Sequence, residues 1–515
     1  MQEKGSQEEV FALLGDPATH GGAAVRRIDT HAASVFLVGG RVYKVKRAVT
    51  FPFLDYSTLA RRKAACDAEM EVNRPYAPDI YLRVVAITRE GDGRLALDGH
   101  GAAVEWAVEM RRFDENATLD HLADRNKIDA ALADALGRAV AAAHRNTPVV
   151  EAEPWLAALG HIIEQNDAEL RDANLFAADV VADLTRKSRA ALDRVRPLLQ
   201  ARGKLGLIRR GHGDLHLGNI ALIDGRPVPF DAIEFDPMIA TGDVFYDLAF
   251  LLMDLIERGL KDAANIVLNR YLTETRRDTD LDALAALPLF MSVRAAIRAK
   301  VTAARLANAV DAERAAIEKS AATYFRLACA LIAPPAPTLV AVGGLSGTGK
   351  SVLARALAPD LAPAPGAVLL RSDVERKALF GVGETERLPA ESYTKEATRK
   401  VYAVLAEKAS RVIAAGHSAV VDAVFAQADE RAMLEATAPR GIGFKGLFLV
   451  ADLETRVARV GRRTGDASDA NDAVARQQEA YNLGTMMWDT VDATGSPDAT
   501  LARARATLGR AAPAG

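Results

Sequence analysis

The segment Gly344-Leu-Ser-Gly-Thr-Gly-Lys-Ser351 combines residue types that can hold a nucleoside triphosphate. It fits the pattern G-x-x-x-x-G-K-[ST], in which the glycines let backbone N–H groups turn toward phosphate oxygens. An apolar run at 339–342 precedes it and a helical pattern starts at its end, which argues against a chance glycine-rich turn. The lysine would reach the β- and γ-phosphates, and the serine hydroxyl would ligate Mg²⁺. The residues assigned to ATP are Gly344, Gly347, Gly349, Lys350 and Ser351, and Ser351 is also assigned to the metal.

Two aspartates follow the next apolar runs of the same region. Residues 367–371 and 419–421 have the pattern of strands, and Asp373 and Asp422 come at or just after their ends. Because ligands bind at the carboxyl ends of parallel strands, both carboxylates should face the γ-phosphate. We assign Asp422 to a water of the Mg²⁺ shell and Asp373 to the acceptor hydroxyl. A helix N-cap is the alternative role for each.

A cluster of arginines precedes a polar loop farther along the chain. Arg456, Arg459, Arg462 and Arg463 share one expected helix. Such a helix end could close an arginine onto the transferring phosphoryl group, and Arg463 is the catalytic candidate. A solvated charged face is the alternative.

A second set of chemical residues lies in the first part of the chain, in Gly211-His-Gly-Asp-Leu-His-Leu-Gly-Asn219. Asp231 follows it, at the end of an apolar run at 228–230. Phosphoryl transfer needs a carboxylate that accepts the hydroxyl proton, together with an amide oxygen and a second carboxylate that hold Mg²⁺. Asp214 is therefore the candidate base, and Asn219 and Asp231 are the candidate metal ligands. The alternative is an acidic turn in a helical domain.

This loop resembles that of aminoglycoside phosphotransferases and choline-kinase-like enzymes, with Gly213 between the histidine and the aspartate. Tyr246-Asp-Leu-Ala-Phe250 continues the resemblance, which implies that Asp247 braces the catalytic loop. It also implies that Ser34 contacts phosphate. Glu234 is a further candidate for a metal or substrate contact. The region from 338 to about 490 resembles small P-loop kinases of metabolites and of polynucleotide 5′ ends.

The nucleotide lysine follows from the pleat of residues 41–46. Val42, Lys44 and Lys46 share one face of this expected strand. The residue two positions before the lysine packs on adenine in kinases and must be apolar, which selects Lys44 and predicts that Lys46 faces solvent. The partner of Lys44 should be an acid of the helix at 59–74. Glu69 and Glu71 are the candidates there, and the family resemblance favours Glu69.

An arginine stripe suggests a property of the acceptor. Arg294, Arg298, Thr302 and Arg305 fall on one side of a helix expected at 291–309. If the stripe faces the acceptor site, it favours an anionic acceptor. The alternative is pairing with nearby acids or water.

The order of elements sets the fold class. Short strand-like runs up to residue 110 give way to helical segments, which predicts an α+β kinase-like domain with lobes at 1–110 and 111–332. The proline-rich linker 333–337 follows. Alternating strands and helices over 338–515 then predict an α/β P-loop domain with a parallel sheet.

Composition limits the remaining choices. The 65 basic and 68 acidic side chains leave a net charge of −3, which makes nucleic acid an unlikely partner. A count of only two cysteines and an N-terminus without a signal-peptide pattern predict a cytoplasmic protein. The one long uncharged stretch contains prolines, which would break a membrane-spanning helix. The sequence thus predicts a bifunctional phosphotransferase with ATP and Mg²⁺ at two sites and small-molecule hydroxyl acceptors. A nucleic-acid 5′-end kinase and an ATP-sensing regulator are the alternatives, and the oligomeric state stays open.

Overall fold

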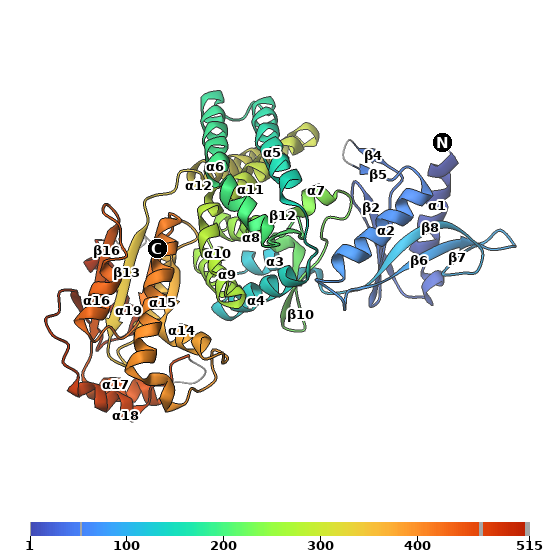
Figure 1. Cartoon of the computed structure of the whole chain (residues 1–515). Coiled ribbons are helices and arrows are strands. Elements are labelled where there is room, and N and C mark those ends of the chain that lie inside the picture. Colours follow the sequence, from blue (N-terminus) through green and yellow to red (C-terminus); the bar gives the residue numbers. More distant parts are fainter. Residues whose placement is uncertain (1, 52–53, 463–466, 510–515) are drawn as a thin grey trace. The chain divides into compact units, whose positions relative to one another are not determined.

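The computed structural model describes residues 2–51, 54–462 and 467–509 of the chain (Figure 1). Cα proximity divides the chain into two compact units, each assembled from three segments. The first unit contains Met1–Val181, Arg196–Arg258 and Val293–Ala304. The second contains Ala182–Val195, Gly259–Ser292 and Arg305–Gly515.

A six-stranded antiparallel sheet opens the first unit. Its order is β1-β2-β3-β8-β6-β7, and helix α2 packs on it because Cys66 and Met70 share an apolar cluster with Val42 and Val108. Thr58 begins α2 as its N-cap, with its hydroxyl accepting a hydrogen bond from the Arg61 N–H. The elements are α1 (Gln2–Gly15), β1 (Val25–Asp29), β2 (Ala33–Val38), β3 (Arg41–Lys46), β4 (Thr50–Phe51), β5 (Leu54–Asp55), α2 (Leu59–Asn73), β6 (Tyr81–Arg89), β7 (Leu95–Leu97) and β8 (Ala102–Arg111).

Helices dominate the middle of the chain, where short strands carry the candidate catalytic loop. The loop lies between β9 (Ile208–Arg210) and the hairpin of β10 (Ile220–Ile223) and β11 (Arg226–Pro229), which ends just before Asp231. β9 pairs with β12 (Thr241–Asp243). The helices are α3 (Leu119–Asp124), α4 (Ala130–Asn146), α5 (Ala152–Asp172), α6 (Ala178–Lys204), α7 (Pro237–Ala240), α8 (Val244–Glu257), α9 (Lys261–Thr275), α10 (Asp278–Asp282), α11 (Leu287–Ala304) and α12 (Asp311–Leu331).

The second unit contains a five-stranded parallel sheet of order β14-β15-β13-β16-β17. Val340 and Val342 of the central strand pack against α13 and α19 on one face of the sheet, and α15 also contacts the strands (Figure 1). The elements are β13 (Thr338–Gly344), α13 (Lys350–Leu357), β14 (Val368–Arg371), α14 (Ser372–Leu379), α15 (Lys395–Ala414), β15 (Ala419–Asp422), α16 (Ala428–Glu435), β16 (Gly443–Val450), α17 (Leu453–Gly461), α18 (Asp472–Gln477), β17 (Asp489–Asp492) and α19 (Pro497–Thr507). The predicted fold class is confirmed. Within the described residues, no helix combines the length and the apolar character needed to cross a membrane.

Side chains of helix α9 form hydrogen bonds with backbone groups at the β14 edge of this parallel sheet. The Asn269 side chain accepts a hydrogen bond from the Leu369 N–H at 2.7 Å and donates one to the Ala367 carbonyl at 3.1 Å, and Asn265 donates to the same carbonyl at 3.0 Å. An edge strand normally exposes such groups as a template for pairing with another chain. The sequence pattern gave no sign that a helix from before residue 333 would cover β14.

We expect Asn269→Leu to lower the free energy of unfolding of the second unit by about 1–3 kcal/mol, because the Leu369 N–H loses its partner in a part-buried position. Urea unfolding followed by the fluorescence of Trp488 in this unit would measure the loss. Asn482→Leu, at an exposed position, is the control and should change little. Equal stability of the two variants would contradict this assignment.

Candidate active sites

Three residues far apart in sequence meet in the first unit. Lys44 Nζ on β3 lies 2.8 Å from Glu69 Oε1 on α2 and 2.7 Å from Asp231 Oδ1 after β11. Glu69 is buried, whereas Glu71 is exposed on the opposite side of α2, so helical period selects Glu69. Burial opposes the charge of Lys44, but Asp231 and Glu69 hold its pKa above the usual range. The structure therefore places the predicted lysine between a helix acid and a candidate metal ligand.

The expectation that Lys46 faces solvent is wrong. Its side chain is 2% exposed, and Nζ lies 2.6 Å from Glu69 Oε2 and in contact with Glu234 Oε1. The pleat puts Lys44 and Lys46 on the same face, and Glu69 offers one oxygen to each. The Tyr56 hydroxyl donates to Glu234 Oε1 at 2.8 Å. Glu234 thus balances a buried lysine, and this contact was missed because 188 residues separate the partners.

An apolar cluster joins side chains of the sheet to the residues that follow β8 and β11. Ile28, Val35 and Val42 belong to one apolar cluster with Phe113 and Phe230, whose ring centroids are 4.9 Å apart. Except for Val42, these side chains are only partly buried. They form a surface on which a planar base could pack. Met110 is buried in this cluster.

The candidate base and a candidate metal ligand are in direct contact. Asn219 Nδ2 donates to Asp214 Oδ2 and to the Asp214 carbonyl, both at 3.0 Å. Burial raises the pKa of Asp214, but the contact with His216 and the charges of His212 and Arg294 lower it to about 2. The carboxylate is therefore ionised at neutral pH and can accept a proton.

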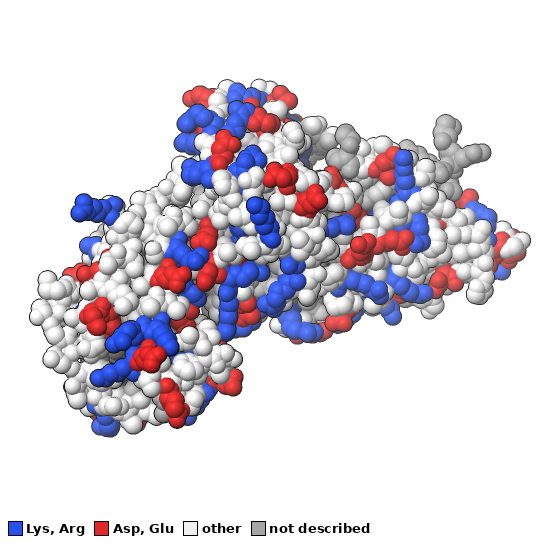
Figure 2. Space-filling model, viewed as in Figure 1, with Lys and Arg blue, Asp and Glu red and all other residues white. Residues whose placement is uncertain are grey.

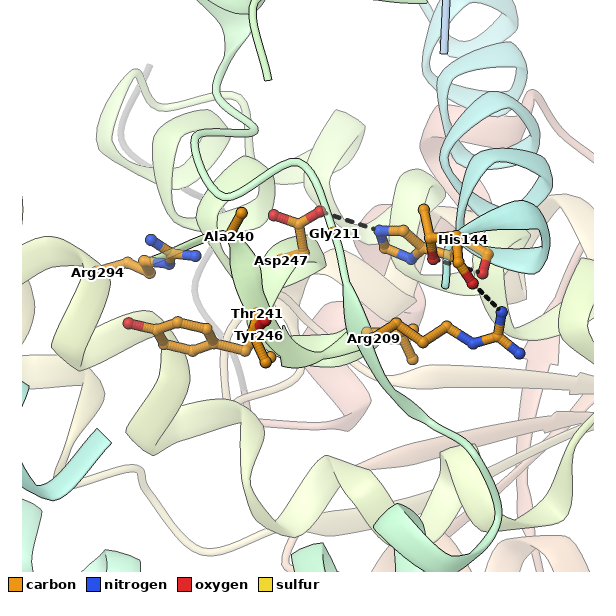
Figure 3. Close-up of a pocket in the computed structure, with 11 residues that line it drawn as sticks. His144, Arg209, Gly211, Ala240, Thr241, Tyr246, Asp247 and Arg294 are labelled. Atoms are coloured by element: carbon orange, nitrogen blue, oxygen red, sulfur yellow. Dashed lines mark hydrogen bonds and ion pairs between the residues drawn. The ribbon is translucent and has the colours of Figure 1, made fainter. Parts of the chain in front are cut away.

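Asp247 at the start of α8 braces the loop that carries Asp214. Its carboxylate accepts hydrogen bonds from the N–H groups of His212 at 2.9 Å and Gly213 at 3.0 Å. His144 Nε2 lies 3.2 Å from the same carboxylate, and Figure 3 shows the histidine and Asp247 directed at each other across a small pocket. Burial opposes ionisation, but the contact with His144 leads the effects that lower the pKa of Asp247 to about 2. These contacts agree with the structural role expected for Asp247.

The predicted arginine stripe is not formed as expected. Helix α11 ends at Ala304, and Arg305 belongs to a following 3₁₀ turn. Arg294 is buried, donates to the Gly213 carbonyl at 3.0 Å, and lies 3.9 Å from the centre of the Tyr246 ring (Figure 3). The guanidinium group of Arg294 is engaged by the catalytic loop and by Tyr246. It therefore does not serve to bind an anionic acceptor.

Ser34, which the resemblance implies as a phosphate contact, is engaged in a hydrogen bond within the first unit. Its buried hydroxyl donates to Asp29 Oδ1 at 2.7 Å, which links the two ends of the β1–β2 hairpin. The structure thus engages Ser34 in holding the hairpin.

The phosphate loop of the second unit joins the central strand β13 to α13. Gly347 has φ +89°, and a Cβ there would lie 2.4 Å from the Arg456 carbonyl oxygen, so only glycine fits. Ser346 is held on both sides, because its N–H donates to Gln478 Oε1 at 2.6 Å and its carbonyl accepts from Arg456 Nε at 2.9 Å. Lys350 Nζ donates to the Leu345 carbonyl at 3.2 Å. The loop is thus preorganised around its backbone.

Arg456 is not a lid residue. It is 1% exposed, and besides Ser346 it contacts the Ala475 carbonyl and Glu479. Arg459 donates to the Ala493 and Gly495 carbonyls. Arg463, the predicted catalytic arginine, lies outside the described residues. A helical stripe of arginines could not reveal that one of them would be buried against the phosphate loop.

Register places the two aspartates where the strands predicted them. Asp422 ends β15 and is aligned with Val342 of β13 and Arg371 of β14. Asp373 lies in the first turn of α14, which begins at Ser372 directly after β14. Arg371 Nε lies 3.2 Å from Asp422 Oδ2, and both side chains are 5% exposed. The sequence pattern gave Arg371 no role beyond a strand end, because its partner Asp422 lies 51 residues away.

We expect transfer at the second site to lose rate as the pH falls. Burial, followed by the charge of Asp422, raises the pKa of Asp373 above its usual range, while Arg371 and Lys350 oppose the shift. If Asp373 accepts the hydroxyl proton, activity is present above this raised pKa and is lost as the pH drops through it. The measurement is kcat against pH in an Asp214→Ala background. A rate that stays flat down to pH of about 4, the ordinary value for aspartate, would exclude this role.

The candidate metal ligands fit a divalent cation that arrives with a nucleotide. No group of three His, Cys, Asp or Glu side chains within the described ranges is placed to hold a metal by itself. Mg²⁺ is usually bound through one or two carboxylates plus substrate phosphates. The Asp231 side chain is 48% exposed, and its carboxylate and the Asn219 amide oxygen are hard donors of the required kind. The donor set of the first unit is therefore suitable for Mg²⁺.

Comparison with known proteins finds a family model for the phosphate-loop region and relatives along most of the chain. Residues 339–482 match the AAA domain family model. The chain is 28% identical over 491 residues to the uncharacterized protein Rv2004c of Mycobacterium tuberculosis, covering 92% of this chain and 94% of the relative. The same values hold for the uncharacterized protein Mb2027c of Mycobacterium bovis.

Solved structures similar to parts of this chain include three phosphotransferases. A gluconokinase from Sinorhizobium meliloti is 22% identical, with 34% of this chain and 92% of that chain covered and a TM-score of 0.26. A choline kinase from Cryptosporidium parvum is 12% identical, with 61% and 89% covered and a TM-score of 0.40. A wild-type aminoglycoside 2′-phosphotransferase-IIIa is 14% identical, with 59% and 92% covered and a TM-score of 0.33.

Proposed function

We propose that this protein is a bifunctional ATP-dependent phosphotransferase that moves the γ-phosphoryl group to hydroxyls of small molecules at two sites. The observation that carries the proposal is that Lys44 Nζ lies within 2.8 Å of carboxylate oxygens of both Glu69 and Asp231. The same unit also holds Asp214 and Asn219. A phosphate loop in the second unit supports the second activity.

In the first unit, each residue has a task that its position permits. Lys44 would bind nucleotide phosphates while Glu69 keeps its ammonium group directed into the site. Asp214 would accept the hydroxyl proton, and Asn219 and Asp231 would hold Mg²⁺, which neutralises charge on the phosphates when it is bound. Catalysis would come mainly from positioning and electrostatic stabilisation.

In the second unit, the backbone N–H groups of Gly347 and Gly349 and the amino end of α13 would bind the phosphates of ATP. Lys350 would contact the transferring group, and Ser351 and Asp422 are suited to Mg²⁺ and its water shell. Asp373 would accept or orient the acceptor hydroxyl. The contact between Arg371 and Asp422 would fix the direction of that carboxylate.

Small-molecule acceptors are favoured by the distribution of charge. Figure 2 shows Lys and Arg side chains interspersed with Asp and Glu side chains over the face viewed, and the net charge is −3. Nucleic-acid binding usually depends on a concentrated basic surface that releases counterions from phosphates. This pattern supports metabolites over oligonucleotides.

The test is transfer from γ-labelled ATP to a metabolite extract by the wild type, Asp214→Ala and Lys350→Ala. Each variant should lose a different labelled product, and the double variant should lose both. A parallel reaction with a 5′-hydroxyl oligonucleotide identifies the end-kinase alternative if only that acceptor is labelled. Binding of ATP with no product in either reaction would favour the ATP-sensing regulator and reject the proposal.

A further inference from the structure

The two carboxylate oxygens of Asp214 have different surroundings. Oδ2 accepts from Asn219 Nδ2 at 3.0 Å and lies 3.4 Å from His216 Nε2. For Oδ1, no hydrogen bond from another side chain or backbone group is found among the described residues, and the side chain is 39% exposed. One oxygen is therefore engaged by the loop itself, whereas the other has no such contact within the described residues of a partly exposed side chain.

The tautomer of His216 follows from its second contact. The Gly218 N–H donates to His216 Nδ1 at 3.1 Å, so this nitrogen must carry the lone pair. The ring proton of a neutral imidazole then resides on Nε2, which is the nitrogen beside Asp214 Oδ2. The ring also packs against Phe250, with centroids 5.6 Å apart, and the side chain is 19% exposed.

The loop sequence makes this arrangement possible. A Cβ at position 218 would lie 2.9 Å from His216 Cε1, so glycine leaves room for the ring. The Leu217 N–H donates to Asp254 Oδ2 at 2.9 Å, which ties the same turn to α8. His216 is therefore held by its own backbone turn, by Phe250 and by the base.

We infer that His216 is a positioning residue that, together with Asn219, holds Asp214 Oδ2 and reserves Oδ1 for the acceptor hydroxyl. This inference rests on the proposed function of the first unit. During transfer the acceptor O–H bond breaks and its proton passes to Oδ1. The acceptor oxygen bonds to the γ-phosphorus as the bond from that phosphorus to the ADP oxygen breaks. His216 takes no proton in this step, because Nε2 already carries one.

The test uses the full chain with Lys350→Ala, which silences the second site, and water as the acceptor in ATP hydrolysis. His216→Asn keeps an oxygen that can accept from the Gly218 N–H but cannot reach Asp214. It should lower kcat by about 10- to 100-fold with KM for ATP nearly unchanged, because a displaced base loses alignment with the hydroxyl. His216→Gln restores a donor at the distance of Nε2 and should recover most of kcat. His161→Asn, at an exposed position on α5, is the matched control and should not change kcat.

The outcomes separate this inference from the function on which it rests. If Asp214→Asn lowers hydrolysis but His216→Asn does not, the inference is overturned and the function stands. If the Asn and Gln variants are equally impaired at unchanged thermal stability, the donor at Nε2 is irrelevant and the inference also fails. If Asp214→Asn leaves hydrolysis unchanged, the proposed base is rejected and the inference with it.

Discussion

Replacing Asp214 with asparagine should reduce phosphoryl transfer at the first site by about 10²–10⁴-fold, the range for loss of a general base. The amide has the size of the carboxylate and keeps a group for Asn219 to contact, so the loop should retain its shape. ATP affinity should change little, because Lys44 and Asp231 hold the nucleotide and its metal in the proposed arrangement. The expected result is therefore a fall in kcat with KM for ATP nearly constant.

The measurement is labelled product formed in a Lys350→Ala background, with ATP binding followed by titration calorimetry. Asp79→Asn, at an exposed position before β6, is the matched control and should keep full turnover. If Asp214→Asn retains a third or more of the parent rate, Asp214 is not the base and another acceptor for the proton must be sought.

Replacing Lys46 with methionine should lower the free energy of unfolding of the first unit by about 3–5 kcal/mol. Methionine fills a similar volume but removes the ammonium group beside Glu234, whose side chain is 9% exposed and keeps the hydrogen bond from the Tyr56 hydroxyl. Burial opposes the charge of Lys46, and Glu69 and Glu234 outweigh it and raise the pKa of the lysine. A lysine with a raised pKa stabilises the fold at every pH below its unfolded value, so the loss should be complete at neutral pH.

The same variant should become more sensitive to acid. Burial raises the pKa of Glu69, but Lys44 and then Lys46 lower it to about 2. A carboxylate with a depressed pKa stabilises the fold above its unfolded pKa of about 4.3, and this contribution is lost as the pH falls through the folded value. Without Lys46 the folded pKa of Glu69 should rise, and the stability that it contributes should shrink.

Urea unfolding at pH 7 and pH 5 measures both effects. The double variant Lys46→Met/Glu234→Gln should be more stable than Lys46→Met, because the unpaired buried charge is removed with its partner. Arg26→Met breaks the exposed pair with Glu115, where the side chains are 65% and 40% exposed, and should cost less than about 1 kcal/mol. A loss for Lys46→Met no larger than that of Arg26→Met would show that the buried cluster contributes little.

The sequence alone determined the motifs whose residues lie close together along the chain. Gly344 to Ser351 and Asp214 to Asn219 are local loops, and backbone geometry fixes their spacing once a strand precedes them. The pleat of β3 was enough to select Lys44, and the family resemblance alone favoured Glu69 over Glu71. The placement of Asp373 and Asp422 followed from the rule that the carboxyl ends of parallel strands share one edge.

Only the tertiary structure decided which charges are buried. Lys46 was predicted to face solvent once the pleat had selected Lys44 as the nucleotide lysine, yet Glu234, 188 residues away, offsets the cost of burying its charge. Three other contacts likewise depend on residues distant in sequence. Arg456 binds the phosphate loop, Arg294 binds the catalytic loop, and Asn269 hydrogen-bonds the edge of β14. The favourable free energy of each contact depends on a partner distant in sequence. Periodicity along one segment could therefore indicate which face is buried but not which residue contacts it.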